Sequence, residues 1–256
     1  MISRRAILAG ALAAIPSRIL RDSVMIPTIA ITFDVYDTTY SNALWDMVSK
    51  GIPGTFFADC DKIGTAGNPS KDNLILMAAN GWEIGARVYG TIAGAEANMV
   101  AVWLNNRGVA CDRLMAQKTA MHNLGFDIKS IAASQRQWSP QLRGVASHLF
   151  ENVRVANNVT TPPTFQAYPI SDPLYVQNGG TNSWGGSDTV ASLSAQLDGL
   201  IANGGLWIPI IHRVDTTRDP AFTVQTSVFQ GFTSYLQSKI AAGQVRAVTF
   251  RDAVKS

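Results

Sequence analysis

The chain has 256 residues, of which 46% are hydrophobic and only 15% are charged. A chain of this length and apolar content can bury a sizeable core, so it is not a disordered chain. The net charge of +3 is small and forms no run of like charges, which argues against nucleic acid as a partner. Two cysteines are too few for a disulfide scaffold or a zinc finger.

At the N-terminus, Arg4 and Arg5 precede an apolar run over residues 6–15. A charged start followed by a short apolar run is typical of a signal peptide, and Ser-Arg-Arg-x-Ile-Leu resembles a twin-arginine export signal. The run is shorter than the ~20 residues that cross a bilayer, so no stable membrane span is expected. We expect residues 1–22 to be an export segment, or alternatively an amphipathic or buried N-terminal helix. Residues 23–256 then form one domain, located in the periplasm or outside the cell.

Short apolar runs alternate with helical stretches that end at glycine, a pattern that indicates βαβ units. Parallel strands are expected near residues 28–34, 54–58, 82–86, 112–116, 126–131, 206–211 and 245–250. This series predicts a β/α barrel or an open α/β sheet. The region from Pro140 to Gly186 breaks the rhythm and is predicted to be an insertion or a set of long loops over one mouth of the barrel.

Polar residues that follow the strands are expected to meet at one mouth, because active sites of β/α folds lie at the C-terminal ends of the strands. This rule selects Asp34, Asp37, Asp59, Asp61, Arg87, Tyr89, Trp138 and His212. His212 is the strongest candidate, because a core histidine has no obvious reason to end a fully apolar strand.

Other candidates have plain structural alternatives. Asp59 and Asp61 equally fit a helix N-cap or a loop anchor. Arg87 could pair with one of these carboxylates, and Trp138 could cover the core. His122 and His148 are expected to have no functional role. Cys60 and Cys111 are expected at opposite faces of the barrel, too far apart for a disulfide, and hence as free thiols.

Four segments together resemble the polysaccharide deacetylase (NodB-homology) family. They are Thr32-Phe33-Asp34, the stretch from Gly51 to Phe57, Gly81 to Gly85, and Ile210-Ile211-His212. Trp138 falls where family members place a pocket-lining tryptophan. The resemblance covers roughly residues 28–256.

The resemblance implies a distorted (β/α) barrel that hydrolyses acetyl groups on sugars. Family members usually hold a divalent metal with one Asp and two His, and the metal polarises the acetyl carbonyl and activates water. A neighbouring Asp is the base and a late His is the acid. These two positions are Asp34 and His212 here.

Departures from the family pattern concern the metal. The metal-binding Asp is replaced by Val35, the two histidines fall on Arg87 and Thr91, and the Arg-x-Pro-x-Gly loop is absent. We therefore expect no metal and no other cofactor at the family position, with Asp34 in direct contact with Arg87 or His212 instead. The guanidinium of Arg87 could hold Asp34 or bind an anionic group where the cation would sit.

Two functions remain open, so the sequence does not decide whether the chain is an enzyme. The first is a deacetylase-like hydrolase acting on a polysaccharide with altered metal chemistry. The alternative is a catalytically inactive glycan-binding barrel, in which Tyr89, Trp138 and Trp184 supply aromatic faces and Arg87 supplies hydrogen bonds. A weaker alternative is a structural or receptor-binding part of an assembly.

Overall fold

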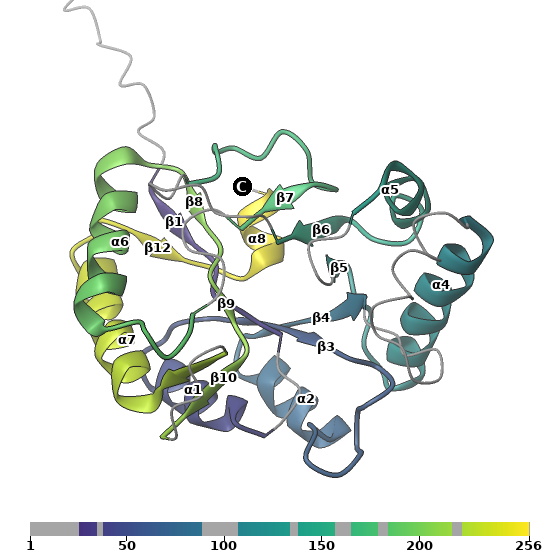
Figure 1. Cartoon of the computed structure of the whole chain (residues 1–256), viewed down its shortest axis with the longest axis horizontal. Coiled ribbons are helices and arrows are strands. Elements are labelled where there is room, and N and C mark those ends of the chain that lie inside the picture. The colour runs from purple at the N-terminus through teal and green to yellow at the C-terminus, as the bar shows by residue number, and fades with distance from the viewer. Residues whose placement is uncertain are drawn as a thin grey trace, which may run out of the picture.

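The computed structural model describes residues 26–34, 38–88, 107–133, 138–156, 165–178, 184–216 and 222–255. Parallel strands form a curled seven-stranded sheet in the order β7-β6-β5-β4-β3-β2-β9 (Figure 1). The strands are β2 (Thr32–Phe33), β3 (Thr55–Ala58), β4 (Glu83–Val88), β5 (Ser130–Ala133), β6 (Asn152–Val155), β7 (Val176–Gln177) and β9 (Ile210–Ile211). The predicted β/α barrel is thus confirmed.

Smaller parallel sheets complete the barrel. β1 (Thr28–Ile29) pairs with β8 (Leu206–Trp207) and β12 (Arg246–Ala247). Hydrogen bonds from Ala30 N to Trp207 O and from Thr32 N to Pro209 O link the runs that contain β1–β2 and β8–β9, so the small sheet continues the large one. A separate pair joins β10 (Arg213–Asp215) to β11 (Thr223–Gln225).

Helices surround the strands on the outside (Figure 1). They are α1 (Tyr40–Ser49), α2 (Lys71–Ala79), α4 (Arg107–Asn123), α5 (Pro140–Ala146), α6 (Val190–Asn203) and α7 (Thr226–Ala241). The short α8 (Phe250–Lys255) lies instead towards the middle of the view, inside the ring of strands (Figure 1). Within the described ranges, no helix combines the length and the apolarity that a bilayer crossing requires.

Strand side chains alternate between two apolar clusters, as the two-residue period of a strand requires. Outward-facing residues such as Ile31, Phe56 and Val153 pack beneath the helices in the large cluster. Inward-facing residues form the smaller cluster, Ala30, Phe57, Ala132, Val176, Leu206 and Ile208 with Phe250 and Ala253 of α8. Helix α8 therefore fills the barrel interior from the end at which the strands begin.

The strand predicted at residues 112–116 is wrong, because this segment lies inside α4. Its buried residues Ala110, Leu114, Gln117 and Met121 recur every three or four positions, which is the period of a helix. Cys111 therefore lies on a helix and not before a strand. Both cysteines are nevertheless free thiols, as expected.

The prediction that Pro140 to Gly186 is an insertion or a set of long loops is also corrected, because this region contributes α5, β6 and β7 to the barrel. The sequence obscures β6, since every second residue of Asn152–Val155 is polar yet all four residues are buried. The expectation of a continuous apolar run therefore missed a strand whose inner face carries Asn152 and Arg154.

A substitution at Gly85 of β4 can test how tightly the barrel interior is packed. A Cβ at this position would lie 2.7 Å from Cδ1 of Phe57 and 2.9 Å from the backbone oxygen of Ser130. We expect Gly85→Ala to lower the free energy of unfolding by about 1–3 kcal/mol, as overpacking does. Gly144→Ala, in α5 with open space around it, is the control and should be neutral or slightly stabilising. Equal urea midpoints for the two variants would contradict this view of the interior.

Candidate functional site

Asp34 lies at the mouth of the barrel, directly after β2, and is 4% exposed. The register Phe33↔Ile211 between β2 and β9 sets His212 beside it, and Asp34 N donates to Ile211 O at 2.9 Å. Arg87, near the end of β4, approaches with Nε 3.9 Å from Asp34 Oδ2 and donates from Nη1 to the Asp34 backbone oxygen at 3.4 Å. The structure thus brings together three of the predicted site residues.

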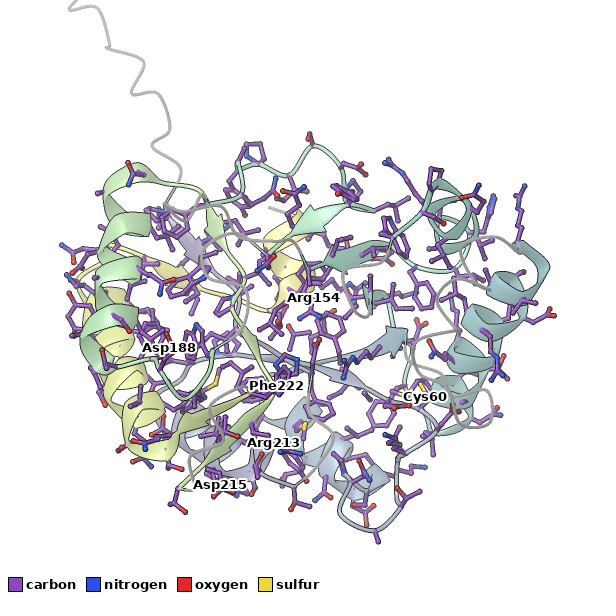
Figure 2. The ribbon with its side chains drawn as sticks, viewed as in Figure 1. Cys60, Arg154, Asp188, Arg213, Asp215 and Phe222 are labelled. Atoms are coloured by element: carbon purple, nitrogen blue, oxygen red, sulfur yellow. The ribbon has the colours of Figure 1, made fainter. Side chains whose placement is uncertain are left out.

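Among the described residues, the charged group closest to the Asp34 carboxylate is the guanidinium of Arg154 on β6, which sequence reasoning did not select. Its Nη2 lies 2.5 Å from Asp34 Oδ2, and its Nη1 donates to Thr32 Oγ1 at 2.9 Å. The guanidinium also lies 4.9 Å from the centre of the Phe57 ring. Arg154 is fully buried and lies centrally in the barrel (Figure 2). The signal that could have found it is the two-residue alternation of Asn152–Val155.

The charge of Asp34 is set by its neighbours. Burial would raise the pKa of its carboxyl, but the positive charges of Arg154 and Arg87 and the hydrogen bond from Arg154 hold the pKa below its ordinary value. Asp34 is therefore an ionised, weakly basic carboxylate at neutral pH.

His212 carries a neutral imidazole at neutral pH. Burial lowers its pKa to about 4, because the attraction of Asp34 is outweighed by desolvation and by the nearby charges of Arg87, Arg154 and Arg213. Its ring lies 5.3 Å from that of Phe222, an aromatic residue that is 52% exposed. Figure 2 places Phe222 close to the middle of the barrel view, between Arg154 and Arg213.

Asp59 fits the structural alternative better than a catalytic role. Its Oδ1 accepts a hydrogen bond from the backbone N of Asp61 at 3.3 Å, and its Oδ2 lies 4.0 Å from Lys62 Nζ. Burial raises the pKa of Asp59. Asp59 therefore anchors the loop after β3.

Burial raises the pKa of the neighbouring Cys60 thiol to about 12, so this thiol is not a nucleophile at neutral pH.

Of the predicted aromatic residues, Trp184 and Trp138 lie within the described ranges. Trp184 is fully buried and packs against Trp207, Phe229 and Phe232, so it presents no face to a sugar and belongs to the core. Trp138 is half-buried and packs against the core just before α5. Tyr89 and Asp37 lie outside the described residues.

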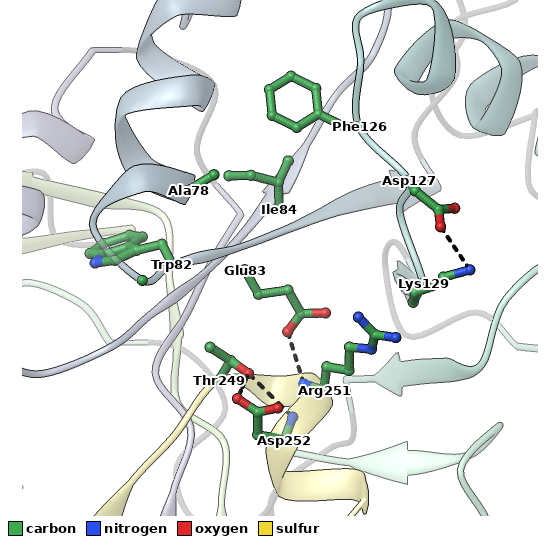
Figure 3. Close-up of a pocket in the computed structure, with 11 residues that line it drawn as sticks. Ala78, Trp82, Glu83, Ile84, Phe126, Asp127, Lys129, Thr249, Arg251 and Asp252 are labelled. Carbon is green, nitrogen blue, oxygen red and sulfur yellow. Dashed lines mark hydrogen bonds and ion pairs between the residues drawn. The ribbon is translucent and has the colours of Figure 1, made fainter.

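A polar pocket of about 350 Å³ opens at the opposite end of the barrel, where the strands begin (Figure 3). Glu83 lies at its centre and its Oε2 accepts hydrogen bonds from Thr55 Oγ1 at 3.1 Å and from Arg251 N at 2.8 Å. Asp127 and Lys129, which line the pocket, form an ion pair of 2.9 Å with each other. The bond from Arg251 N to Glu83 fastens α8 to β4, in keeping with the stabilising role of this face in β/α barrels.

Comparisons with known proteins identify the architecture. A family 4 acetyl xylan esterase from Clostridium thermocellum, in complex with cobalt, superposes with a TM-score of 0.54 at 14% identity over 89% of this chain and 90% of its own. A peptidoglycan N-acetylglucosamine deacetylase superposes with a TM-score of 0.55 at 14% identity over 91% of this chain and 90% of its own. A variant of a Bacillus subtilis peptidoglycan deacetylase superposes with a TM-score of 0.52 at 12% identity over 90% of this chain and 91% of its own.

The chain has the polysaccharide deacetylase fold. The resemblance predicted from the sequence is thereby confirmed at the level of the fold. No family model and no curated protein sequence matches the chain.

A divalent metal, which the deacetylase fold implies, does not fit the described residues of this mouth. Among them, no three His, Cys, Asp or Glu side chains converge as metal ligands. Two of the family positions, Val35 and Thr91, lie outside the described residues, and the third is Arg87. Asp34 already faces two guanidinium groups, which would repel a dication in the same space.

The pKa of His212 predicts an acid-sensitive fold. A group whose pKa is lowered by folding stabilises the fold above its ordinary pKa of 6.5, and this contribution is lost as the pH falls towards 4. The free energy of unfolding should therefore decline between pH 6.5 and pH 4, and His212→Gln should decline less steeply. His122→Gln, at an exposed site, is the control for urea unfolding at each pH. If the free energy of unfolding fell equally with pH in the wild type and both variants, the lowered pKa of His212 would be refuted.

Proposed function

We propose that this protein binds an oligosaccharide or polysaccharide at the mouth of the barrel, around Asp34, Arg87 and His212, and that it does not use metal-dependent deacetylation. The likeness to enzymes named for xylan and peptidoglycan supports a carbohydrate ligand. A carboxylate and a guanidinium beside a half-exposed aromatic, Phe222, supply the hydrogen bonds and the apolar face that sugars need.

The ion pair between Arg154 and Asp34 is the observation that carries this proposal. With 2.5 Å between Nη2 and Oδ2, a protein cation is bonded directly to the carboxylate at the base position of the family, and its charge would repel a dication placed beside it. A carboxylate held in this way has little basicity, and a histidine with a pKa of about 4 holds no proton to donate at neutral pH. Both features favour binding over acid–base hydrolysis.

Hydrolysis of acetyl groups without a metal is the second candidate. It is favoured by one observation, namely that Asp34 and His212, the base and acid positions of the family resemblance, end adjacent strands β2 and β9. In this scheme Asp34 is the base that activates water, and His212 is the acid that protonates the leaving group. Trp138 would border the same mouth in either function.

Binding to acetylated and deacetylated xylo- and chito-oligosaccharides, measured by calorimetry, tests the proposal. We expect one of these series to bind, and Asp34→Ala to weaken the binding roughly tenfold or more, since a hydrogen bond to a charged group is worth ~1.5–3 kcal/mol. Asp127→Ala, at the opposite end of the barrel, should bind as the wild type does.

The same proteins decide between binding and catalysis. Acetate release should be absent and unchanged by added Zn²⁺ or Co²⁺ or by a chelator. One equivalent of zinc that is lost on Asp34→Ala, or metal-dependent acetate release, would contradict the proposal. Metal-independent release that requires His212 would establish the second candidate.

We further propose that residues 1–22 are an export segment and residues 23–256 the mature domain, which acts outside the cytoplasm. The support is the order of Arg4, Arg5 and the apolar run over residues 6–15. Mass spectrometry of the exported chain should find the segment removed, and the Arg4→Lys/Arg5→Lys variant should stay in the cytoplasm. Export of this variant at the wild-type level would contradict a twin-arginine signal.

A further inference from the structure

Arg154 reaches across the barrel. Its strand, β6, is separated from β2 by β5, β4 and β3 in the sheet, yet its guanidinium bonds both Thr32 and Asp34 of the β2 segment. The sheet must curl for these residues to meet, so the side chain spans the interior instead of pairing with a neighbouring strand.

Three contacts fix the position of this guanidinium. Phe57 lies against its face at 4.9 Å, Asp34 Oδ2 accepts from Nη2, and Thr32 Oγ1 accepts from Nη1. The Thr32 hydroxyl donates its own proton to Pro209 O at 2.9 Å, which leaves its oxygen free to accept from Arg154. Because these three contacts fix the planar guanidinium, the Asp34 carboxylate that it binds has little rotational freedom.

Arg87 lies farther from the Asp34 carboxylate than Arg154 does. Its Nε approaches Asp34 Oδ2 only to 3.9 Å, whereas Nη2 of Arg154 lies 2.5 Å from the same oxygen.

The other carboxylate oxygen of Asp34, Oδ1, is buried and accepts no hydrogen bond from the described residues. A buried acceptor without a donor is costly, and a ligand hydroxyl or amide that enters the mouth would relieve this cost.

We propose that Arg154 is a positioning residue that fixes the orientation of Asp34 from inside the barrel, and that Asp34 Oδ1 receives a hydrogen-bond donor of a saccharide, a hydroxyl or an amide. The ligand half of this inference rests on the proposed function, whereas the positioning half does not. The lowered pKa of Asp34, for which burial is opposed most strongly by Arg154, agrees with it.

Arg154→Lys is the decisive variant, because lysine keeps the positive charge but cannot bond Asp34 and Thr32 with one planar fork. The pKa of the Asp34 carboxyl is measured by carbon-13 NMR titration, and saccharide affinity is measured as a function of pH. We expect the variant to have a higher Asp34 pKa than the wild type and a roughly tenfold weaker affinity at pH 7. The loss of binding in acid should begin at a higher pH.

Arg143→Lys is the matched control, since Arg143 forms a surface ion pair with Asp172 at 2.8 Å. It should change neither the Asp34 titration nor the affinity. Thr32→Val keeps Arg154 and removes one of its three contacts, so it should shift the Asp34 titration in the same direction by less. This variant carries the test if Arg154→Lys does not fold.

Distinct outcomes separate the two proposals. An Arg154→Lys protein with reduced thermal stability but an unchanged Asp34 titration would show a purely structural role and overturn the positioning proposal. A wild-type protein that binds none of the saccharides would refute the proposed function and the ligand half, while the titration would still decide the positioning half.

Discussion

The contact of Arg154 with Asp34 inside the barrel is the interaction on which the mouth depends. It ends a column of buried groups that begins at α8, where the Phe250 ring packs edge-on against Phe57 at 5.8 Å. Phe57 in turn supports the guanidinium, and the guanidinium holds the carboxylate. A barrel interior is a packed core, and here its last layer is ionic instead of apolar.

This ionic layer changes the chemistry that the fold can support. A buried carboxylate needs a partner, because an isolated charge in a medium of low dielectric is strongly destabilised. A metal is one such partner and an arginine is another, but they leave the carboxylate with different properties. Paired with Arg154, Asp34 stays ionised and hydrogen-bonded, a state suited to holding a ligand in place.

Much of the mouth could be predicted from the sequence, because strand ends are local signals. Asp34, Arg87 and His212 each follow or end an apolar run, and parallel pairing brings such ends together. Glycines that end helices also placed most of the strands correctly. These features depend on short stretches of chain and need no knowledge of distant contacts.

The remaining features depend on long-range packing. Arg154 was missed because its strand is half polar, and its partner Asp34 is 120 positions away in the sequence. Trp184 lies in a glycine-rich stretch that resembles an exposed loop. Its backbone N nevertheless donates to Ile210 O at 3.0 Å, and its indole packs in the core against Phe229 and Phe232 of α7. The segment 112–116 contains apolar residues whose spacing fits a helix better than a strand once the whole of α4 is considered.

The position of α8 has a consequence for how the chain acquires its site. Phe250 N donates to Thr55 Oγ1 at 2.8 Å, a contact between residues 195 positions apart. The support beneath Arg154 is therefore completed only when the most distant parts of the domain have met. Contacts of such long sequence separation form late, since the entropy of closing the intervening loop must be overcome first. Completion of the barrel by α8 thus coincides with completion of the packing beneath Arg154, and a chain in which α8 has not docked lacks the Phe250 ring that supports Phe57.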